Sequence, residues 1–194
     1  MRKIIVANMM SLDGYYSGPG KDTSVLPMDE AFDASNGERL RAADTFLLGQ
    51  KTYDMFRSFW PSVANDASAS PTNRDTSRLM NAMEKIVISD SMPLKQKEPW
   101  SNTRVIRRAD AHKQLAQLRQ QAGKEIFIGG SHIMWNDLLV NGLVDELHLM
   151  VGAVILGDGT PIFPKKLEVA LELIETRKWD GSENAMLRYR VGPR

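Results

Sequence analysis

The chain alternates between short apolar runs and longer segments in which apolar and charged residues are mixed. Apolar runs of about four to eight residues bounded by turn residues are typical of strands, and apolar positions three or four residues apart are typical of surface helices. The pattern predicts strands at 4–10, 45–49, 85–89, 103–107, 125–130, 144–156, 171–179 and 185–191. It predicts helices at 29–43, 51–56, 77–83, 109–121 and 131–142.

Strand and helix alternate along most of the chain, and two further strands follow at its C-terminal end. This order predicts an α/β fold with a mostly parallel sheet and an antiparallel edge. Residues 58–76 are rich in Ser, Asn, Asp and Pro, so we expect mostly loop there, long enough to close over a site as a lid. No repeat or linker interrupts the pattern, which favours one domain over residues 1–194.

Composition narrows the function classes. Apolar residues make up 42% and charged residues 25%, and the net charge of +1 gives no overall field that would attract nucleic acid or anionic lipid. The chain has no Cys, and its three His show no ligand spacing, so we expect no metal site. The longest apolar stretch, 147–156, is far below the roughly 20 residues of a membrane span. The N-terminus reads as a strand rather than a signal peptide, and we expect a cytoplasmic protein.

Candidate chemistry gathers where predicted strands end and helices begin. The three segments are Gly49-Gln50-Lys51-Thr52, Ser89-Asp90-Ser91 and Gly129-Gly130-Ser131-His132. Helix N-termini at the carboxyl ends of strands suit phosphates, and glycine lets the backbone approach an anion closely. Together the segments could hold a dinucleotide, although their spacing matches neither the Rossmann nor the Walker motif. Simple turns and helix caps at Thr52 and Ser131 are the alternative.

Several short motifs in this order resemble the dihydrofolate reductase-like superfamily, most closely the small single-domain proteins grouped with the reductase half of the riboflavin-pathway deaminase-reductase. The motifs are Ser11-Leu12-Asp13-Gly14, Leu48-Gly49-x-x-Thr52-Tyr53, Lys85-Ile86-Val87-Ile88-Ser89, Ile128-Gly129-Gly130, Leu143-Val144-Asp145-Glu146-Leu147 and Ile155-Leu156-Gly157-Asp158-Gly159 before Pro161-Ile162-Phe163. The resemblance covers nearly the whole chain. It implies a three-layer α/β/α sandwich and an NADPH-dependent reductase, with a homodimer as its assembly.

By this resemblance, the cofactor contacts fall on the strand ends. Gly49, Lys51 and Thr52 would contact its phosphates, and Ser89 its adenosine end. The pyrophosphate would lie against Gly129, Gly130, Ser131 and His132.

The chain departs from the family pattern at three places. Family members often carry Arg directly after the Gly of the Gly-x-x-Thr motif, where this chain has Gln50 beside Lys51. The riboflavin-pathway reductases typically have Glu before the double glycine, where this chain has Ile128, and an Asp-Pro-rich segment where it reads Tyr53-Asp54-Met55-Phe56. These differences weaken the specific pyrimidine-reductase assignment without weakening the cofactor prediction.

Two carboxylates are candidates for proton transfer. Asp29 follows Leu26-Pro27-Met28 and resembles the carboxylate at the start of the first helix of dihydrofolate reductases, although it could only be satisfying the helix dipole. Asp13 follows the first strand and could bind substrate or form a turn with Gly14. The aromatic side chains of Tyr53, Phe56 and Trp60 could stack on a heterocycle or belong to the core.

Our prediction is therefore an NADPH-dependent reductase of a small pterin-like or pyrimidine-like heterocycle. One alternative is the 5-amino-6-(5-phosphoribosylamino)uracil reductase of riboflavin biosynthesis, which would need a basic pocket for the ribose phosphate. Another is a nucleotide- or heterocycle-binding protein without turnover, because no residue is an unambiguous catalyst.

Overall fold

The strands form one large sheet and one small one in the computed structural model, which describes residues 1–95 and 98–192. Their bounds are β1 (Ile4–Ser11), β2 (Tyr15–Ser17), β3 (Ala43–Gly49), β4 (Glu84–Ile88), β5 (Thr103–Ile106), β6 (Glu125–Gly129), β7 (Glu146–Gly152), β8 (Thr160–Pro161), β9 (Leu171–Lys178) and β10 (Ala185–Val191). The large sheet has the order β5-β4-β3-β6-β1-β7-β10-β9, and β2 pairs with β8. All pairings from β5 to β7 are parallel, whereas β10 and β9 are antiparallel to their neighbours.

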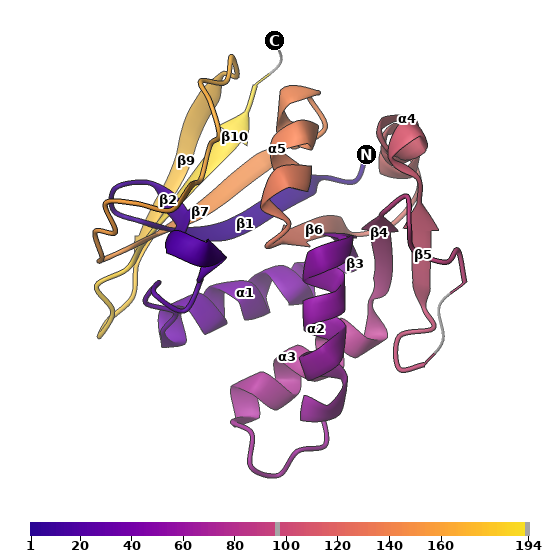
Figure 1. Ribbon diagram of the computed structural model, residues 1–194, viewed down its shortest axis with the longest axis horizontal. Helices are drawn as coiled ribbons and strands as arrows, with labels where there is room; N and C mark the ends of the chain where they lie inside the picture. The colour runs from indigo at the N-terminus through magenta and orange to yellow at the C-terminus, as the bar shows by residue number, and fades with distance from the viewer. Residues whose placement is uncertain (96–97, 193–194) are drawn as a thin grey trace.

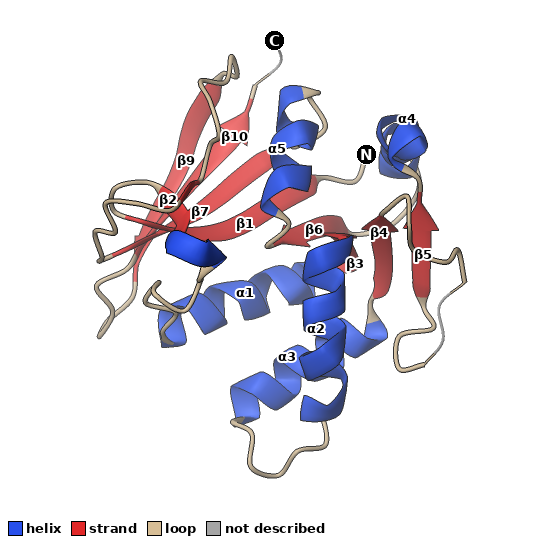
Figure 2. Cartoon of the chain, in the orientation of Figure 1, coloured by secondary structure: helices blue, strands red, loops and turns tan. Residues whose placement is uncertain are grey.

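Helices cover both faces of the large sheet. Their bounds are α1 (Glu30–Ala42), α2 (Gln50–Val63), α3 (Pro71–Ala82), α4 (Arg108–Arg119) and α5 (His132–Val140), with a 3₁₀ turn η1 (Pro19–Lys21). In the view of Figure 1, α1, α2 and α3 lie below the sheet and α4 and α5 above it. Figure 2 shows the resulting helix, sheet and helix layers. The predicted three-layer α/β/α sandwich, with a mostly parallel sheet and an antiparallel edge, is confirmed.

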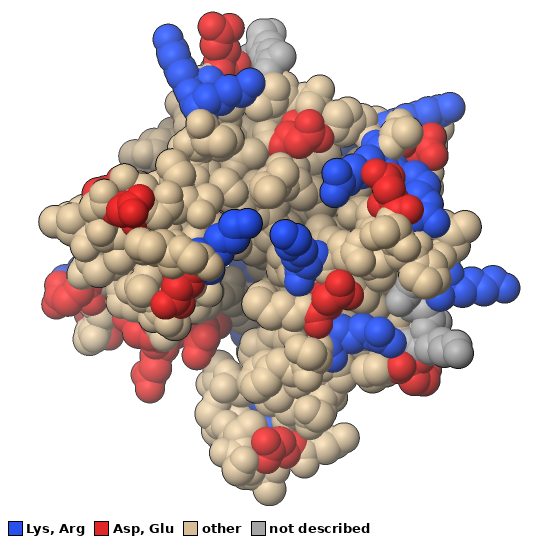
Figure 3. Space-filling view, viewed as in Figure 1, with Lys and Arg blue, Asp and Glu red and all other residues tan. Residues whose placement is uncertain are grey.

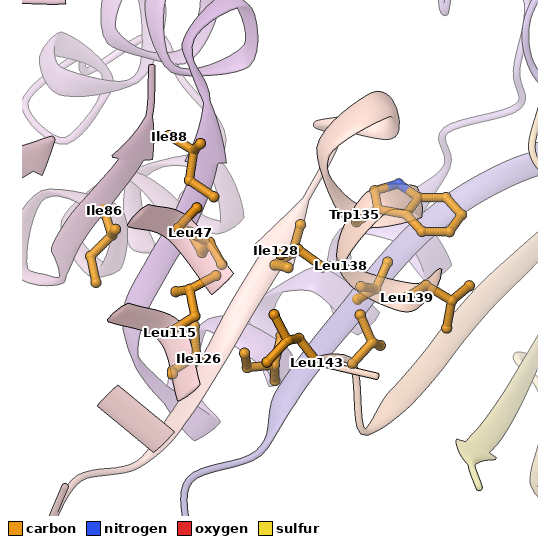
Figure 4. Close-up of a cluster of buried hydrophobic side chains, with 14 of the residues drawn as sticks. Leu47, Ile86, Ile88, Leu115, Ile126, Ile128, Trp135, Leu138, Leu139 and Leu143 are labelled. Carbon is orange, nitrogen blue, oxygen red and sulfur yellow. The ribbon is translucent and has the colours of Figure 1, made fainter. Parts of the chain in front are cut away.

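Alternate residues of the central strands supply two separate cores. In β3, Leu47 packs with α4 and α5, whereas Phe46 and Leu48 pack with α1, α2 and α3. Figure 4 shows the first of these cores, in which strand residues meet Leu115 from α4 and Trp135 from α5. A sheet covered on both faces needs apolar residues on both sides of each strand, which is why these strands read as unbroken apolar runs.

The prediction of a loop at 58–76 is wrong. Helix α2 continues to Val63, and α3 begins at Pro71, so only the short segment 64–70 connects them. Ser70 caps α3, because its hydroxyl accepts a hydrogen bond from the Asn73 backbone N–H at 3.1 Å. Proline is favoured in the first turn of a helix, where its missing N–H costs nothing. The loop-like composition of this segment is thus partly the signature of a helix start, and the proposed lid has no long loop to form it.

The strand predicted at 144–156 is shorter in the structure. β7 ends at Gly152, where a Cβ would lie 2.9 Å from both Met9 Cε and Pro27 Cδ. This close approach needs glycine, and beyond it the chain leaves the sheet. The short pair of β2 and β8 was not predicted, because its strands are only three and two residues long.

Candidate active site

The N-termini of α2 and α5 lie side by side at the carboxyl ends of β3 and β6. The Gly49 N–H donates to Ser131 Oγ at 3.0 Å, and the Ser131 N–H donates to Thr52 Oγ1 at 3.1 Å. Neither helix has a side-chain cap on its own N-terminus. Two helix dipoles therefore present their positive ends at one place, an arrangement that favours an anion such as a phosphate.

Gly130 allows this meeting of two helices. Its φ is +62°, in the left-handed region, and a Cβ at this position would lie 2.9 Å from Thr52 Cγ2. Ser131 is also left-handed, with φ of 53°. The Asn8 side-chain amide donates to the Gly130 carbonyl at 3.3 Å and ties the turn to β1. The structure thus brings together Gly49, Thr52, Gly130 and Ser131, all of them predicted cofactor residues.

His132 faces the neighbouring loop. Its ring stacks on Tyr16, with ring centroids 4.8 Å apart and planes at 20°, and its Nε2 lies 2.9 Å from the Ile162 carbonyl oxygen. With Nε2 donating to that carbonyl, the imidazole is occupied by a structural hydrogen bond. What His132 can offer a phosphate is its backbone N–H in the first turn of α5.

Ser89 lies at the end of β4 and is joined to α2 by Gln50. Gln50 Oε1 accepts from Ser89 Oγ at 2.5 Å and from Ser91 Oγ at 2.7 Å. Arginine has no acceptor atom, so it could not replace Gln50 in these two bonds. The departure from the family pattern at this position therefore has a structural role. The cation available in this turn is the exposed Lys51.

A cavity of about 270 Å³ lies next to this turn, between β1 and β6 on one side and α1, α2 and α3 on the other. Gly129 and Gly130 form part of its wall, so one segment borders both the cavity and the helix N-termini. Apolar side chains dominate the rest of the wall. The lining residues are Ala7, Asn8, Met9, Tyr16, Thr23, Leu26, Met28, Phe32, Asp33, Asn36, Leu40, Phe46, Met55, Phe56, Trp60, Thr76, Met80, Phe127, Gly129 and Gly130.

The three aromatic residues predicted to bind substrate have different surroundings. Phe56 and Trp60 line the cavity, half-buried on α2. Tyr53 is fully buried, its hydroxyl lies 3.1 Å from Thr103 Oγ1, and its ring packs beside Trp100. Tyr53 is therefore a core residue, and its prediction as a substrate contact is corrected.

The two predicted catalytic carboxylates both have structural partners outside the cavity. Asp13 accepts from the Leu156 and Gly157 backbone N–H groups, and hydrogen bonds, led by that from Ser11 Oγ, lower its pKa to about 2. Asp29 is the cap of α1, accepting from the Phe32 N–H at 3.1 Å and from Ser182 Oγ at 2.5 Å.

Partial burial opposes ionisation of Asp29, but these hydrogen bonds bring its pKa below the ordinary value. Neither Asp13 nor Asp29 lines the cavity. Their surroundings favour the turn and helix-cap alternatives that the sequence left open.

The carboxylate that does line the cavity is Asp33, which the sequence analysis missed. Burial, and then the negative charges of Asp29 and Glu30, raise the pKa of Asp33. Asp33, Asn36 and Leu40 are spaced at i, i+3 and i+7, so they share one side of α1, and all three line the cavity. Two polar residues in register with a buried leucine were the signal that could have found this site.

The charges around the site give no sign of a metal centre. Within residues 1–95 and 98–192, no group of three or more His, Cys, Asp or Glu side chains could hold a metal ion. On the face shown in Figure 3, basic and acidic side chains are interspersed over a mostly uncharged surface. None of the helices in the described ranges is long and apolar enough to cross a membrane.

The fold is the dihydrofolate reductase-like α/β/α sandwich that the motifs predicted. Residues 2–183 match the family described as the RibD C-terminal domain, and the chain belongs to that family. An uncharacterized protein of Bacillus subtilis (strain 168), YyaP, is 25% identical over 177 residues, which cover 91% of this chain and 88% of that protein.

Two solved structures illustrate the shared fold. The deaminase/5-amino-6-(5-phosphoribosylamino)uracil reductase of Thermotoga maritima has a TM-score of 0.68 at 13% identity, and the match covers 98% of this chain and 57% of that one. The dihydrofolate reductase of Enterococcus faecalis, solved with NADP(H), has a TM-score of 0.61 at 16% identity, with 98% and 97% covered. At these identities the likeness establishes the fold alone.

Proposed function

We propose that this protein uses NADPH to reduce a small pterin-like or pyrimidine-like heterocycle held in the cavity beside Gly129 and Gly130. The observation that carries the proposal is the shared wall: the segment that borders the paired helix N-termini also borders the apolar cavity. A dinucleotide bound by its pyrophosphate at the helix N-termini would thus have its far end within reach of a ring in the cavity. Positioning of two reactants in this way is the main contribution of such a protein.

The residues present fit such a cofactor. The uncapped N-termini of α2 and α5 supply backbone N–H donors, and the exposed Lys51 supplies a positive charge. Gly130 keeps the turn free of a side chain where α2 and α5 approach each other. When bound, NADPH would supply the hydride. The chain itself would bind the phosphates, orient the substrate and keep the cavity dry with its aromatic and methionine side chains.

Asp33 would hold the proton that reduction requires. Its raised pKa keeps the carboxyl protonated to higher pH than an ordinary aspartate, and it lies in the cavity wall where a substrate ring nitrogen would meet it. Tyr16 is a second donor in the wall, and burial raises the pKa of its hydroxyl, so it stays protonated. A single domain over residues 1–194, a cytoplasmic location and a homodimer remain further parts of this proposal, and sedimentation of the purified protein tests the dimer.

Nucleotide titration tests the proposal directly. Trp60 lines the cavity, so binding of NADPH or NADH is followed by tryptophan fluorescence. We expect NADPH binding at micromolar concentration and a large loss in Thr52→Val, which removes the acceptor for the Ser131 N–H. Thr176→Val, at an exposed position on β9, is the matched control. If neither nucleotide binds at millimolar concentration, the proposal fails.

Turnover separates the enzyme from a binding protein. Loss of nicotinamide absorbance would be followed with dihydropterins, dihydrofolate and aminopyrimidines. Nucleotide binding without oxidation by any of them would favour the binding-protein alternative.

Lys51 tests the preference for NADPH over NADH. Gln50, which stands where relatives often have Arg, is uncharged and accepts hydrogen bonds from Ser89 and Ser91. The positive charge of this turn that can meet the extra phosphate of NADPH is therefore that of Lys51. Lys51→Gln should weaken NADPH binding about tenfold and leave NADH binding nearly unchanged. Lys113→Gln, exposed on α4 across the sheet, should change neither affinity. Equal weakening of both nucleotides by Lys51→Gln would contradict this role.

A further inference from the structure

Over the part of the chain that the structure describes, the wall of the cavity has one carboxyl group and no strong base. Among the residues that the structure describes, no Lys or Arg lines the cavity. Its polar lining consists of Asn8, Tyr16, Thr23, Asp33, Asn36 and Thr76. A phosphate monoester carries roughly −1.5 to −2 charges near neutral pH, and burying such a charge without a cationic partner is costly.

Two further carboxylates precede Asp33 on α1 and act on it electrostatically. Asp29 caps the helix, Glu30 lies in its first turn, and Asp33 lines the cavity one turn further on. Their mutual repulsion already raises the pKa of Asp33, after the effect of burial. A phosphate placed here would meet the same repulsion.

Three arginines of α1 and α3 that are close in sequence to lining residues are bonded outside the cavity. Arg39 donates to Glu125 Oε2 at 3.2 Å, and Arg41 donates to Asp75. From α3, Arg74 donates to the backbone carbonyls of 67 and 69 in the α2–α3 connection. None of these three arginines lines the cavity, and turning one of them into it would break an existing bond.

The rest of the wall favours an apolar ring system. Phe56, Trp60 and Met80 line the part of the wall formed by α2 and α3, and Leu26, Met28 and Phe32 line the part formed by α1 and the segment before it. Side chains of this kind stack on flat rings, and methionine adapts to their outline. A volume of about 270 Å³ is at the small end for organic ligands, which leaves little room for a solvated phosphate sugar.

We infer that the substrate is a planar heterocycle with an apolar or uncharged substituent and no phosphate, whose ring N–H or amino groups face Asp33 and Asn36. This inference rests on the proposed function and narrows it. It separates the protein from a reductase of phosphoribosylated aminopyrimidines, which would need a cation where this cavity has a carboxyl.

A matched pair of ligands tests the inference without requiring turnover. Isothermal titration would compare 6-hydroxymethylpterin with its phosphate monoester, and uridine with uridine 5′-monophosphate, on the intact protein. We expect the unphosphorylated member of at least one pair to bind about tenfold or more tightly than its ester. An ester that binds as tightly as its parent would overturn the inference, and so would the absence of binding by all four ligands.

An added cation should reverse the discrimination. Met28 lines the cavity but is 46% exposed, so Met28→Arg can place a guanidinium at the rim without burying it. We expect this variant to bind the ester at least about fivefold more tightly than the parent protein does. Leu94→Arg adds the same charge at an exposed site outside the lining and should not do so.

Asp33→Asn is a second variant, whose near-isosteric side chain preserves the wall. This variant should reduce the difference in binding affinity between each ligand and its phosphate ester. If neither Met28→Arg nor Asp33→Asn changes the discrimination, charge does not set it and the inference fails.

Failure of the inference is distinguishable from failure of the proposed function. Oxidation of NADPH by a phosphorylated heterocycle alone would refute the inference and leave the reductase proposal standing. Discrimination against the esters by a protein that binds no NADPH would refute the reductase proposal and leave the substrate inference standing.

Discussion

Replacing Gly130 by alanine tests whether the close meeting of α2 and α5 forms the nucleotide site. The left-handed conformation at φ of +62° costs a residue with a Cβ about 1–2 kcal/mol. The new Cβ would also lie 2.9 Å from Thr52 Cγ2, so Thr52 must move. Because Thr52 Oγ1 accepts from the Ser131 N–H, its movement would also lose a hydrogen bond worth about 0.5–1.5 kcal/mol. We expect Gly130→Ala to lower the free energy of unfolding by about 1.5–3.5 kcal/mol in total.

Gly142 provides a control with the same backbone strain and no contact. Its φ is +68°, and a Cβ there would meet nothing within 4 Å. Gly142→Ala should therefore cost only about 1–2 kcal/mol and leave NADPH affinity unchanged. Thr52→Ser removes the methyl group that the Gly130 Cβ would meet and keeps the hydroxyl. In that background, Gly130→Ala should cost about 1 kcal/mol less than it does alone.

Urea unfolding followed by tryptophan fluorescence gives these free energies, and nucleotide titration on the same samples gives the affinities. We expect Gly130→Ala to weaken NADPH binding at least about tenfold, because the two helix N-termini move apart. A cost no greater than that of Gly142→Ala, together with unchanged NADPH affinity, would refute the reasoning. Additive effects of Gly130→Ala and Thr52→Ser would refute the steric part alone.

Three further predictions concern ionisable groups. Asp33→Asn should lower kcat by about 100-fold or more, and it should abolish the fall in kcat that the wild-type enzyme shows as pH rises through the raised pKa of Asp33. The control, Asp110→Asn on α4, should change neither. Asp29→Ala should lower the free energy of unfolding by about 1 kcal/mol at pH 7 without changing kcat. Because the pKa of Asp29 is lowered in the folded state, the stabilisation should fade as pH falls below about 4, which urea unfolding across pH measures. Burial lowers the pKa of Lys85 from 10.5 to about 7 in the folded protein. Between these two pH values the Lys85 amine binds a proton in the unfolded chain but not in the folded one, so the free energy of unfolding of the wild-type protein should rise with pH there. Lys85→Met should lose this slope, and Lys113→Met should keep it.

The strands could be predicted because burial on both faces leaves an unmistakable pattern. Runs such as 45–49 and 85–89 contain apolar residues at nearly every position, and the structure shows why in the two cores that share them. The loop prediction for 58–76 failed because the pattern there is ambiguous. Its Ser and Pro residues are common both in loops and at helix starts, and only the hydrogen bond from the Asn73 N–H to Ser70 decides between them.

The candidate site was predictable where it depends on local sequence and obscure where it depends on packing. Glycine between a strand end and a helix start is visible in the sequence alone, so the meeting of Gly49 and Gly130 at two helix N-termini could be anticipated. Asp33 lines the cavity because of how α1 packs, which the sequence does not show. Asp29 accepts a hydrogen bond from Ser182, a residue far along the chain, and this contact could not be predicted either. Tyr53 and Phe56 belong to the same turn of α2, yet one is in the core and the other in the cavity wall.

In the proposed function, the wall that Gly129 and Gly130 share between nucleotide site and cavity would let the binding of one ligand affect the binding of the other. Asn8 holds the Gly130 carbonyl from β1 and itself lines the cavity, so a ring that moves Asn8 also moves the turn between the helices. Any heterocycle that tightens nucleotide binding by a given factor must have its own binding tightened by the same factor. In the proposed reductase, the oxidised and reduced nucleotides would then affect how tightly substrate and product are held.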